Sequence, residues 1–89
     1  MSDESQHKIP YEIQRQIAAA PGDSMYLLLH VNETGPVQFA AIEKAGYEVR
    51  HQTSIVPCYA VSGPGQGLRE LVKEAWLVRV EEDGAVETM

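Results

Sequence analysis

The run MYLLLHV at residues 25–31 is largely apolar, is seven residues long, and is bounded by turn residues on both sides. A buried helix needs at least about ten residues, whereas strands in globular proteins have roughly 3 to 10. We therefore expect residues 25–31 to form a central strand of a sheet. Turns are expected immediately before it, at residues 21–23, and after it, at residues 32–35.

A short helix is expected before this strand. In the segment 9–20 an isoleucine recurs every four residues, which is typical of one face of a helix. Pro21 ends this helix because proline has no backbone N–H and cannot continue the hydrogen-bond pattern. Residues 1–8 are polar and lack periodicity, so we expect a disordered tip there. The isoleucines of the apolar face are Ile9, Ile13 and Ile17.

Helix and strand patterns then alternate along the chain. Pro36 opens a helix over residues 37–45, and Gly46 is expected to end it. Residues 47–56 alternate between two sets of side chains, which is the period of a strand with one solvated face. The residues assigned to one face of that strand are Tyr47, Val49 and His51.

A third strand, a second helix of the domain and a fourth strand follow. Pro57 interrupts the strand pattern, and CYAVSG at residues 58–63 resumes it. The glycine-rich segment 63–67 indicates a turn, and the apolar spacing after it predicts a helix over residues 66–75. The last strand is expected at residues 76–81, where the sequence reads WLVRVE.

The order of elements after the first helix is β-α-β-β-α-β. This order is typical of the α+β class and of the ferredoxin-like, split β-α-β arrangement. We therefore expect a four-stranded antiparallel sheet with two helices on one face, an N-terminal helix, and an open second face. The length of 89 residues allows one compact domain. Residues 1–24 are assigned to the tip and the first helix, and residues 25–89 to the domain, with a C-terminal tail from residue 84.

The charge of the chain argues against some classes of partner. Thirteen acidic and seven basic residues give a net charge of −6, which repels the phosphate backbone of nucleic acids. No apolar run approaches the roughly 20 residues of a membrane span, and the N-terminus has no apolar signal segment. We expect no nucleic-acid or membrane partner and a cytoplasmic location. The single cysteine, Cys58, fits a reducing compartment.

No pattern typical of an active site is present in the sequence. His30, His51 and Cys58 have neither the close spacing of metal ligands nor the context of a nucleophile motif. The glycines of residues 63–67 lack the lysine and the spacing of a phosphate-binding loop. We therefore expect no catalytic residue, no metal and no cofactor, and structural roles for Cys58 and His30.

An acidic cluster at the end of the last strand is the sharpest local charge feature. It comprises Glu81, Glu82 and Asp83. Composition alone favours a solvated acidic turn. In a second interpretation, these carboxylates bind the N-terminal ends of helices in a partner protein, where unpaired backbone N–H groups and the helix dipole attract negative charge.

Residues 77–89 read LVRVEEDGAVETM, and they follow LVKEAW at residues 71–76 and AGYEV at residues 45–49. Together these segments resemble the propeptide, or inhibitor I9, domain of subtilisin-like serine proteases. The resemblance covers roughly residues 25–89 and includes a Gly-x-x-Val step from residue 46 to residue 49. It implies a stand-alone, non-enzymatic protein that inhibits a subtilisin-like serine protease or chaperones its folding.

The resemblance also implies how such a protein binds. The open sheet face packs on two parallel surface helices of the protease, and Glu81, Glu82 and Asp83 cap those helices. The tail enters the substrate cleft as an added strand. Met89 then fills the primary specificity pocket, and an apolar residue lies three positions before it. The implied cleft residues are Val86, Glu87, Thr88 and Met89.

A different class of function fits the same fold. A ferredoxin-like regulatory or oligomerisation module would bind a small ligand, or an identical subunit in a homodimer, through its open sheet face. An accessible sheet face beside a protruding tail favours the inhibitor, whereas a dimer that buries this face favours the module. The N-terminal helix also matters, because it would block the inhibitor if it covered that face.

Overall fold

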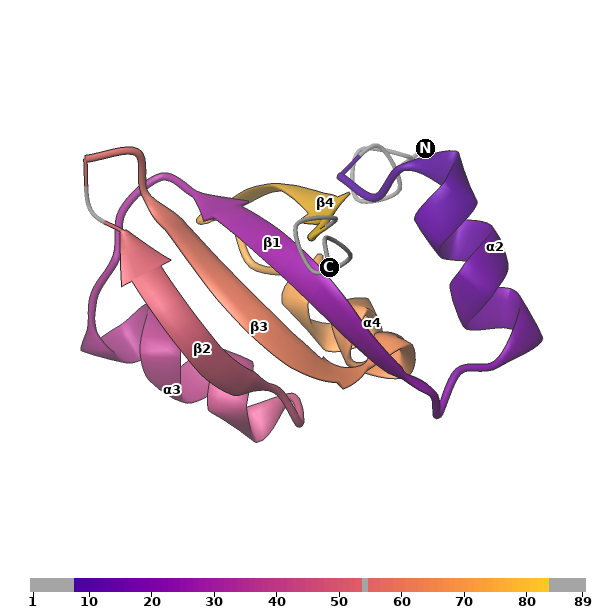
Figure 1. Ribbon diagram of the computed structural model, residues 1–89. Helices are drawn as coiled ribbons and strands as arrows, with labels where there is room; N and C mark the ends of the chain where they lie inside the picture. Colours follow the sequence, from indigo (N-terminus) through magenta and orange to yellow (C-terminus); the bar gives the residue numbers. More distant parts are fainter. Residues whose placement is uncertain (1–7, 54, 84–89) are drawn as a thin grey trace, which may run out of the picture.

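The computed structural model of the protein describes residues 8–53 and 55–83 (Figure 1). Within these residues, four strands form one antiparallel sheet in the order β2-β3-β1-β4, accompanied by three α-helices and a 3-10 turn. The expected α+β class and four-stranded antiparallel sheet are confirmed. The strands are β1 (Ser24–Val31), β2 (Glu48–Thr53), β3 (Cys58–Pro64) and β4 (Leu77–Glu82). The helices are α2 (Tyr11–Ala19), α3 (Pro36–Lys44) and α4 (Leu68–Leu71), and the 3-10 turn is η1 (Gly65–Gly67).

The strand β1 is an inner strand of the sheet, because it pairs with β3 on one side and with β4 on the other. Leu27 and Leu29 of β1 are fully buried, whereas Tyr26 in the same strand is 47% exposed. This alternation follows from the pleat of a strand, which turns successive side chains to opposite faces. The run at residues 25–31 is therefore a central strand, as expected, with only one face in the core.

All three helices contribute to a single core on one side of the sheet. Figure 1 shows α3 and α4 behind the sheet, and their residues Ile42 and Leu71 are buried in the same cluster as Leu29. The helix α2, which forms where the sequence predicts it, adds Ile13 and Ile17 to this cluster and contacts η1. The opposite side of the sheet, called the uncovered face below, carries no helix among the described residues.

Two glycine positions adapt the backbone around the buried side chain of Tyr47. Gly46 has a φ of 104° and ends α3, as expected, because this backbone conformation costs glycine little. A Cβ atom at Gly67 would lie 2.5 Å from the carbonyl oxygen of Ala45 and 2.7 Å from the ring of Tyr47. The glycine-rich segment 63–67 is therefore a structural connection that lets η1 lie directly against that ring.

The helix expected over residues 66–75 is wrong in length, because α4 has only four residues, Leu68–Leu71. After Val72, the backbone N–H groups of Lys73 and Glu74 bond carbonyl groups three residues back, which is the pattern of a 3-10 turn. The ammonium group of Lys8 donates hydrogen bonds to the carbonyl oxygens of Val72 and Glu74, at 3.1 and 2.9 Å. These bonds satisfy carbonyl groups that a continuing helix would have used.

Lys8 also closes part of one edge of the sheet. Its carbonyl oxygen accepts a hydrogen bond from the backbone N–H of Val80 in β4, with an N···O distance of 2.7 Å. The expectation of a disordered tip is therefore wrong for Lys8. The rest of that tip, residues 1–7, lies outside the described residues. None of the helices within the described ranges is long and apolar enough to cross a membrane.

The strand β2 is shorter than the strand expected at residues 47–56, and it contains a bulge. A turn replaces the last residues of the expected strand. The register with β3 shifts between Val49 and His51, so the intervening Arg50 has no partner on β3. His51 therefore pairs with Ala60 and is exposed. The expectation that His51 shares a face with Val49 is wrong, because the extra residue reverses the alternation.

Candidate functional site

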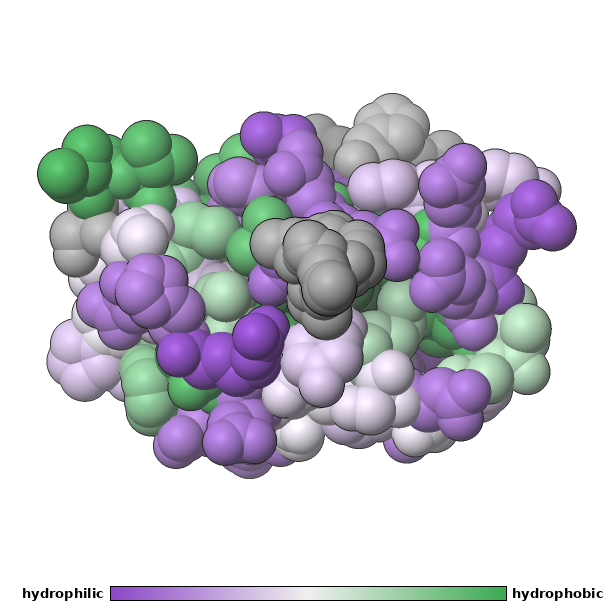
Figure 2. All heavy atoms as spheres, viewed as in Figure 1, coloured by the Kyte–Doolittle hydropathy of each residue, from purple (hydrophilic) through white to green (hydrophobic). Residues whose placement is uncertain are grey.

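The uncovered face of the sheet is the candidate functional site, because its side chains face away from the core. Figure 2 views the molecule from this side and shows many hydrophilic residues on it. An apolar group at the upper left lies over the β2–β3 turn, where Ile55 and Val56 are exposed. The pairing of the strands places the following residues on the uncovered face: Tyr26, Leu28 and His30 of β1, Cys58, Ala60 and Ser62 of β3, and Arg79 and Glu81 of β4.

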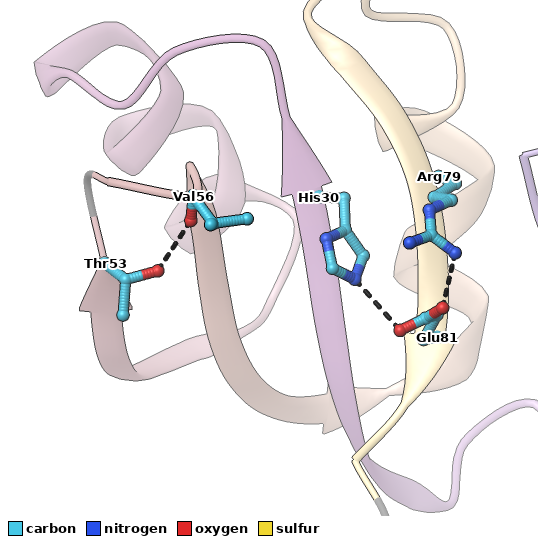
Figure 3. A network of polar contacts seen from close by, with 5 residues as sticks. All are labelled: His30, Thr53, Val56, Arg79 and Glu81. Atoms are coloured by element: carbon cyan, nitrogen blue, oxygen red, sulfur yellow. Dashed lines mark hydrogen bonds and ion pairs between the residues drawn. The ribbon is translucent and has the colours of Figure 1, made fainter.

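A three-residue polar network joins β1 and β4 on this face (Figure 3). The His30 ring donates a hydrogen bond from Nε2 to Oε1 of Glu81 at 3.0 Å, and Arg79 binds the other carboxylate oxygen. His30 and Arg79 are direct partners in the β1–β4 register, and Glu81 lies two residues further along β4. The hydrogen bond from His30, with support from the charge of Arg79, holds the pKa of Glu81 below its ordinary value. The carboxylate of Glu81 is therefore ionised and fixed in position.

A second network connects the two edge strands of the sheet. Arg50 extends from the bulge in β2, and its guanidinium group lies 4.7 Å from the centre of the Tyr26 ring in β1. The same group contacts Oδ2 of Asp83, just after β4, with an N···O distance of 3.3 Å. The backbone N–H of Asp83 donates to the carbonyl oxygen of Tyr26 at 3.0 Å. We call Arg50, Tyr26 and Asp83 the Arg50 strap.

The predicted helix-capping residues do not share one face. Glu81 lies on the uncovered face, and the contact with Arg50 places the Asp83 carboxylate on the same side. Glu82 pairs with Leu27, whose side chain is in the core, so Glu82 points to the opposite side and is exposed at the edge. The predicted cleft residues, Val86, Glu87, Thr88 and Met89, lie outside the described residues.

Cys58 lies on the uncovered face, directly opposite His30 in the β1–β3 register. Partial burial raises the pKa of its thiol, and the charges of Glu81 and Asp83 raise it further. A raised pKa keeps the thiol protonated, which is the opposite of what a nucleophilic cysteine or a metal ligand requires. Across residues 8–53 and 55–83, no three His, Cys, Asp or Glu side chains come close enough to hold a metal ion.

The sequence did not point to the partners of the carboxylates. Arg50 and Tyr26 are 24 positions apart and lie on strands that are not neighbours, so no local motif connects them. His30 and Glu81 can meet once β1 and β4 are adjacent and antiparallel. Predicting this contact, however, requires the register of the two strands to be known to within one residue. His30 has a hydrogen-bond partner at Nε2, which fits the structural role expected for it.

Comparison with known proteins gives no relative for this chain: no family model, no curated protein and no solved structure matches it.

Proposed function

We propose that this protein is a non-enzymatic binding protein that inhibits, or chaperones the folding of, a subtilisin-like serine protease, in the manner of a subtilisin propeptide. The proposal includes the ferredoxin-like, split β-α-β architecture. The strand order β2-β3-β1-β4 supports it, as do the positions of α3 between β1 and β2 and of α4 between β3 and β4. The sequence resemblance over residues 25–89 supplies the class of partner.

The observation that carries the proposal is the uncovered face with two fixed carboxylates at one end of it. Glu81 is held by His30 and Arg79, Asp83 is held by Arg50, and both carboxylates lie just before the residues proposed to enter the cleft. The three helices pack on the other side, so among the described residues none obstructs a partner surface. Such a face suits two helices of a partner whose N-terminal N–H groups donate hydrogen bonds to the capping carboxylates.

The structure also refines which acidic residues would act together. Glu81 and Asp83 lie on the side of the sheet that would meet the protease, whereas Glu82 points to the side of the helices. In the proposed complex, Glu81 and Asp83 cap the partner helices, and Glu82 contributes only through its charge. Val86, Glu87, Thr88 and Met89 occupy the substrate cleft in an extended conformation, where backbone hydrogen bonds give affinity and side-chain pockets give specificity.

The test is a titration of a subtilisin-type and a chymotrypsin-type protease with the full chain and with a variant that lacks residues 86–89. We expect inhibition of the subtilisin type alone. Removal of the tail should raise the inhibition constant about 30-fold or more, because anchor residues contribute about 2 kcal/mol or more to binding. Mass spectrometry over several hours shows whether the chain stays intact. Rapid degradation without inhibition would contradict the proposal.

A second candidate function is a module that pairs with an identical subunit through the uncovered face. The observation that favours it is the balance of charge on this face. Arg50 and Arg79 are paired there with Asp83 and Glu81, although the chain as a whole carries a charge of −6. Two copies would therefore repel each other least through this face. A concentration-dependent dimer in sedimentation experiments, weakened by Leu28→Lys, would favour the module over the inhibitor.

A further inference from the structure

The Arg50 strap spans the uncovered face from one edge strand to the other. Arg50 leaves β2 at the bulge, and β3 and β1 lie between β2 and β4. Val49 pairs with Val61 on the core side, so the alternation along β2 turns the side chain of the next residue, Arg50, to the uncovered face. The bulge also turns the following residue, His51, to this face, because His51 pairs with Ala60.

Three contacts of the strap fix the position of Asp83. Its backbone N–H bonds the carbonyl oxygen of Tyr26, its carboxylate contacts Arg50, and Arg50 is held over the ring of Tyr26. The Asp83 side chain is only 13% exposed, against 39% for Arg50. Partial burial strengthens such an ion pair relative to one in open solvent, and a planar guanidinium group can stack on an aromatic ring while it binds a carboxylate.

The strap lies where the described part of the sheet ends and residues 84–89 begin. A peptide that binds as an added strand gains affinity when its attachment point is fixed before binding, because less conformational entropy is lost in the complex. We propose that Arg50 and Tyr26 are positioning residues of the inhibitor, which act through Asp83 to fix where the C-terminal tail leaves the sheet. This inference rests on the proposed function, since it concerns the same tail.

The chain provides a matched control for the strap. Arg15 of α2 lies over the ring of Tyr11, with the guanidinium carbon 5.9 Å from the ring centre. This pair has the same chemistry as Arg50 and Tyr26, but it belongs to the helix next to η1, on the other side of the sheet. Arg15→Ala therefore removes a guanidinium group from an aromatic ring without a change to the uncovered face.

The first measurement is the inhibition constant against subtilisin. Each substitution is tested in the full chain and in a chain that lacks residues 84–89. In the full chain, Arg50→Ala should weaken inhibition about tenfold, because the tail loses its fixed attachment point. Arg50→Lys should recover part of this loss, and Arg15→Ala should cause none. In the shortened chain, Arg50→Ala should weaken the remaining affinity clearly less than in the full chain, because only the contribution of Asp83 and the sheet face is then affected. An equal loss in both chains, or no loss in either, would overturn the positioning role while the proposed function stands.

The second measurement does not depend on a protease. In the free full chain, Arg50→Ala should speed hydrogen exchange of the Asp83 amide at least about fivefold, whereas Arg15→Ala should not, because the opening of that bond reports local order. An unchanged exchange rate would show that Arg50 does not fix Asp83. If the full chain inhibits no protease of this type, the proposed function fails, and the role of Arg50 in inhibition fails with it.

Discussion

The hydroxyl group of Tyr59 contacts both backbone polar groups of Gly35. It accepts a hydrogen bond from the N–H of Gly35 at 3.0 Å and donates to the carbonyl oxygen of the same residue at 3.3 Å. Tyr59 lies in β3 with its side chain fully buried, and Gly35 immediately precedes α3. Gly35 has no side chain that could cap the helix, so Tyr59 takes over part of this role and connects the sheet to the start of α3.

Tyr59→Phe should therefore destabilise the fold. The substitution keeps the ring and its edge-on contact with Phe39, but it leaves the polar groups of Gly35 without this partner. We expect the free energy of unfolding to fall by about 1–2 kcal/mol, measured by urea denaturation. Tyr11→Phe is the control, because Tyr11 is 71% exposed, and it should change stability by less than about 0.5 kcal/mol. Equal effects of the two substitutions would refute the capping role.

Gly67→Ala should destabilise the protein by about 1–3 kcal/mol, as is usual when an atom is forced into a filled site. The new Cβ atom would meet the backbone oxygen of Ala45, which cannot move aside as a flexible side chain would. Thermal unfolding monitored by circular dichroism measures the effect. Gly22→Ala is the control, because a Cβ atom there has no neighbour within 4 Å. A Gly67→Ala protein as stable as Gly22→Ala would contradict the packing described here.

Glu81→Gln should reduce stability in a way that depends on pH. The folded-state pKa of Glu81 lies below its ordinary value of 4.5, so the ionised form stabilises the fold. This contribution is fully present above about pH 4.5 and is lost as the pH falls through the lower, folded-state pKa. Wild type should be more stable than Glu81→Gln at pH 7, and the two should converge toward pH 3 in urea titrations.

The neighbouring residue provides the control for that experiment. Glu82 is one position away in the same strand, but it points to the other side of the sheet and is exposed. Glu82→Gln should therefore show a smaller difference from wild type at pH 7. If the difference for Glu81→Gln stayed constant between pH 7 and pH 3, the His30–Glu81 hydrogen bond would not be the cause.

Lys8→Met should destabilise the fold by roughly 1–2 kcal/mol, because it removes two charge-assisted hydrogen bonds to carbonyl groups while it keeps a long side chain. Urea denaturation measures the loss. Lys73→Met is the control, since Lys73 is 71% exposed and its ion pair with Glu70 spans 3.9 Å, so its effect should be near zero. A loss for Lys73→Met as large as that for Lys8→Met would argue against a specific role for Lys8.

The parts of the fold that the sequence predicts are those that depend on local signals. The apolar run at residues 25–31 required a buried strand, and Pro36 and Gly46 mark the two ends of α3. The glycines near residue 65 indicated a turn, although the close approach of the Tyr47 ring to Gly63 and Gly67 is visible only in three dimensions.

The parts that the sequence did not predict depend on contacts between distant segments. The length of α4 is limited where Lys8, 64 residues away, binds the carbonyl group of Val72. The bulge at Arg50 depends on how β2 is aligned with β3, and the period of the strand pattern gives no sign of it. For the same reason, the acidic cluster was predicted as one set, although the alternation in β4 separates Glu82 from Glu81.

The bulge in β2 has a further effect on how copies of the protein meet at high concentration. An edge strand with a regular row of unpaired N–H and C=O groups is a template on which other chains add strands and grow fibrils. In β2 the bulge interrupts this row, and at β4 the carbonyl group of Lys8 already occupies the N–H of Val80. A variant with Arg50 deleted would offer a flat edge and would aggregate at concentrations where the natural chain stays dispersed.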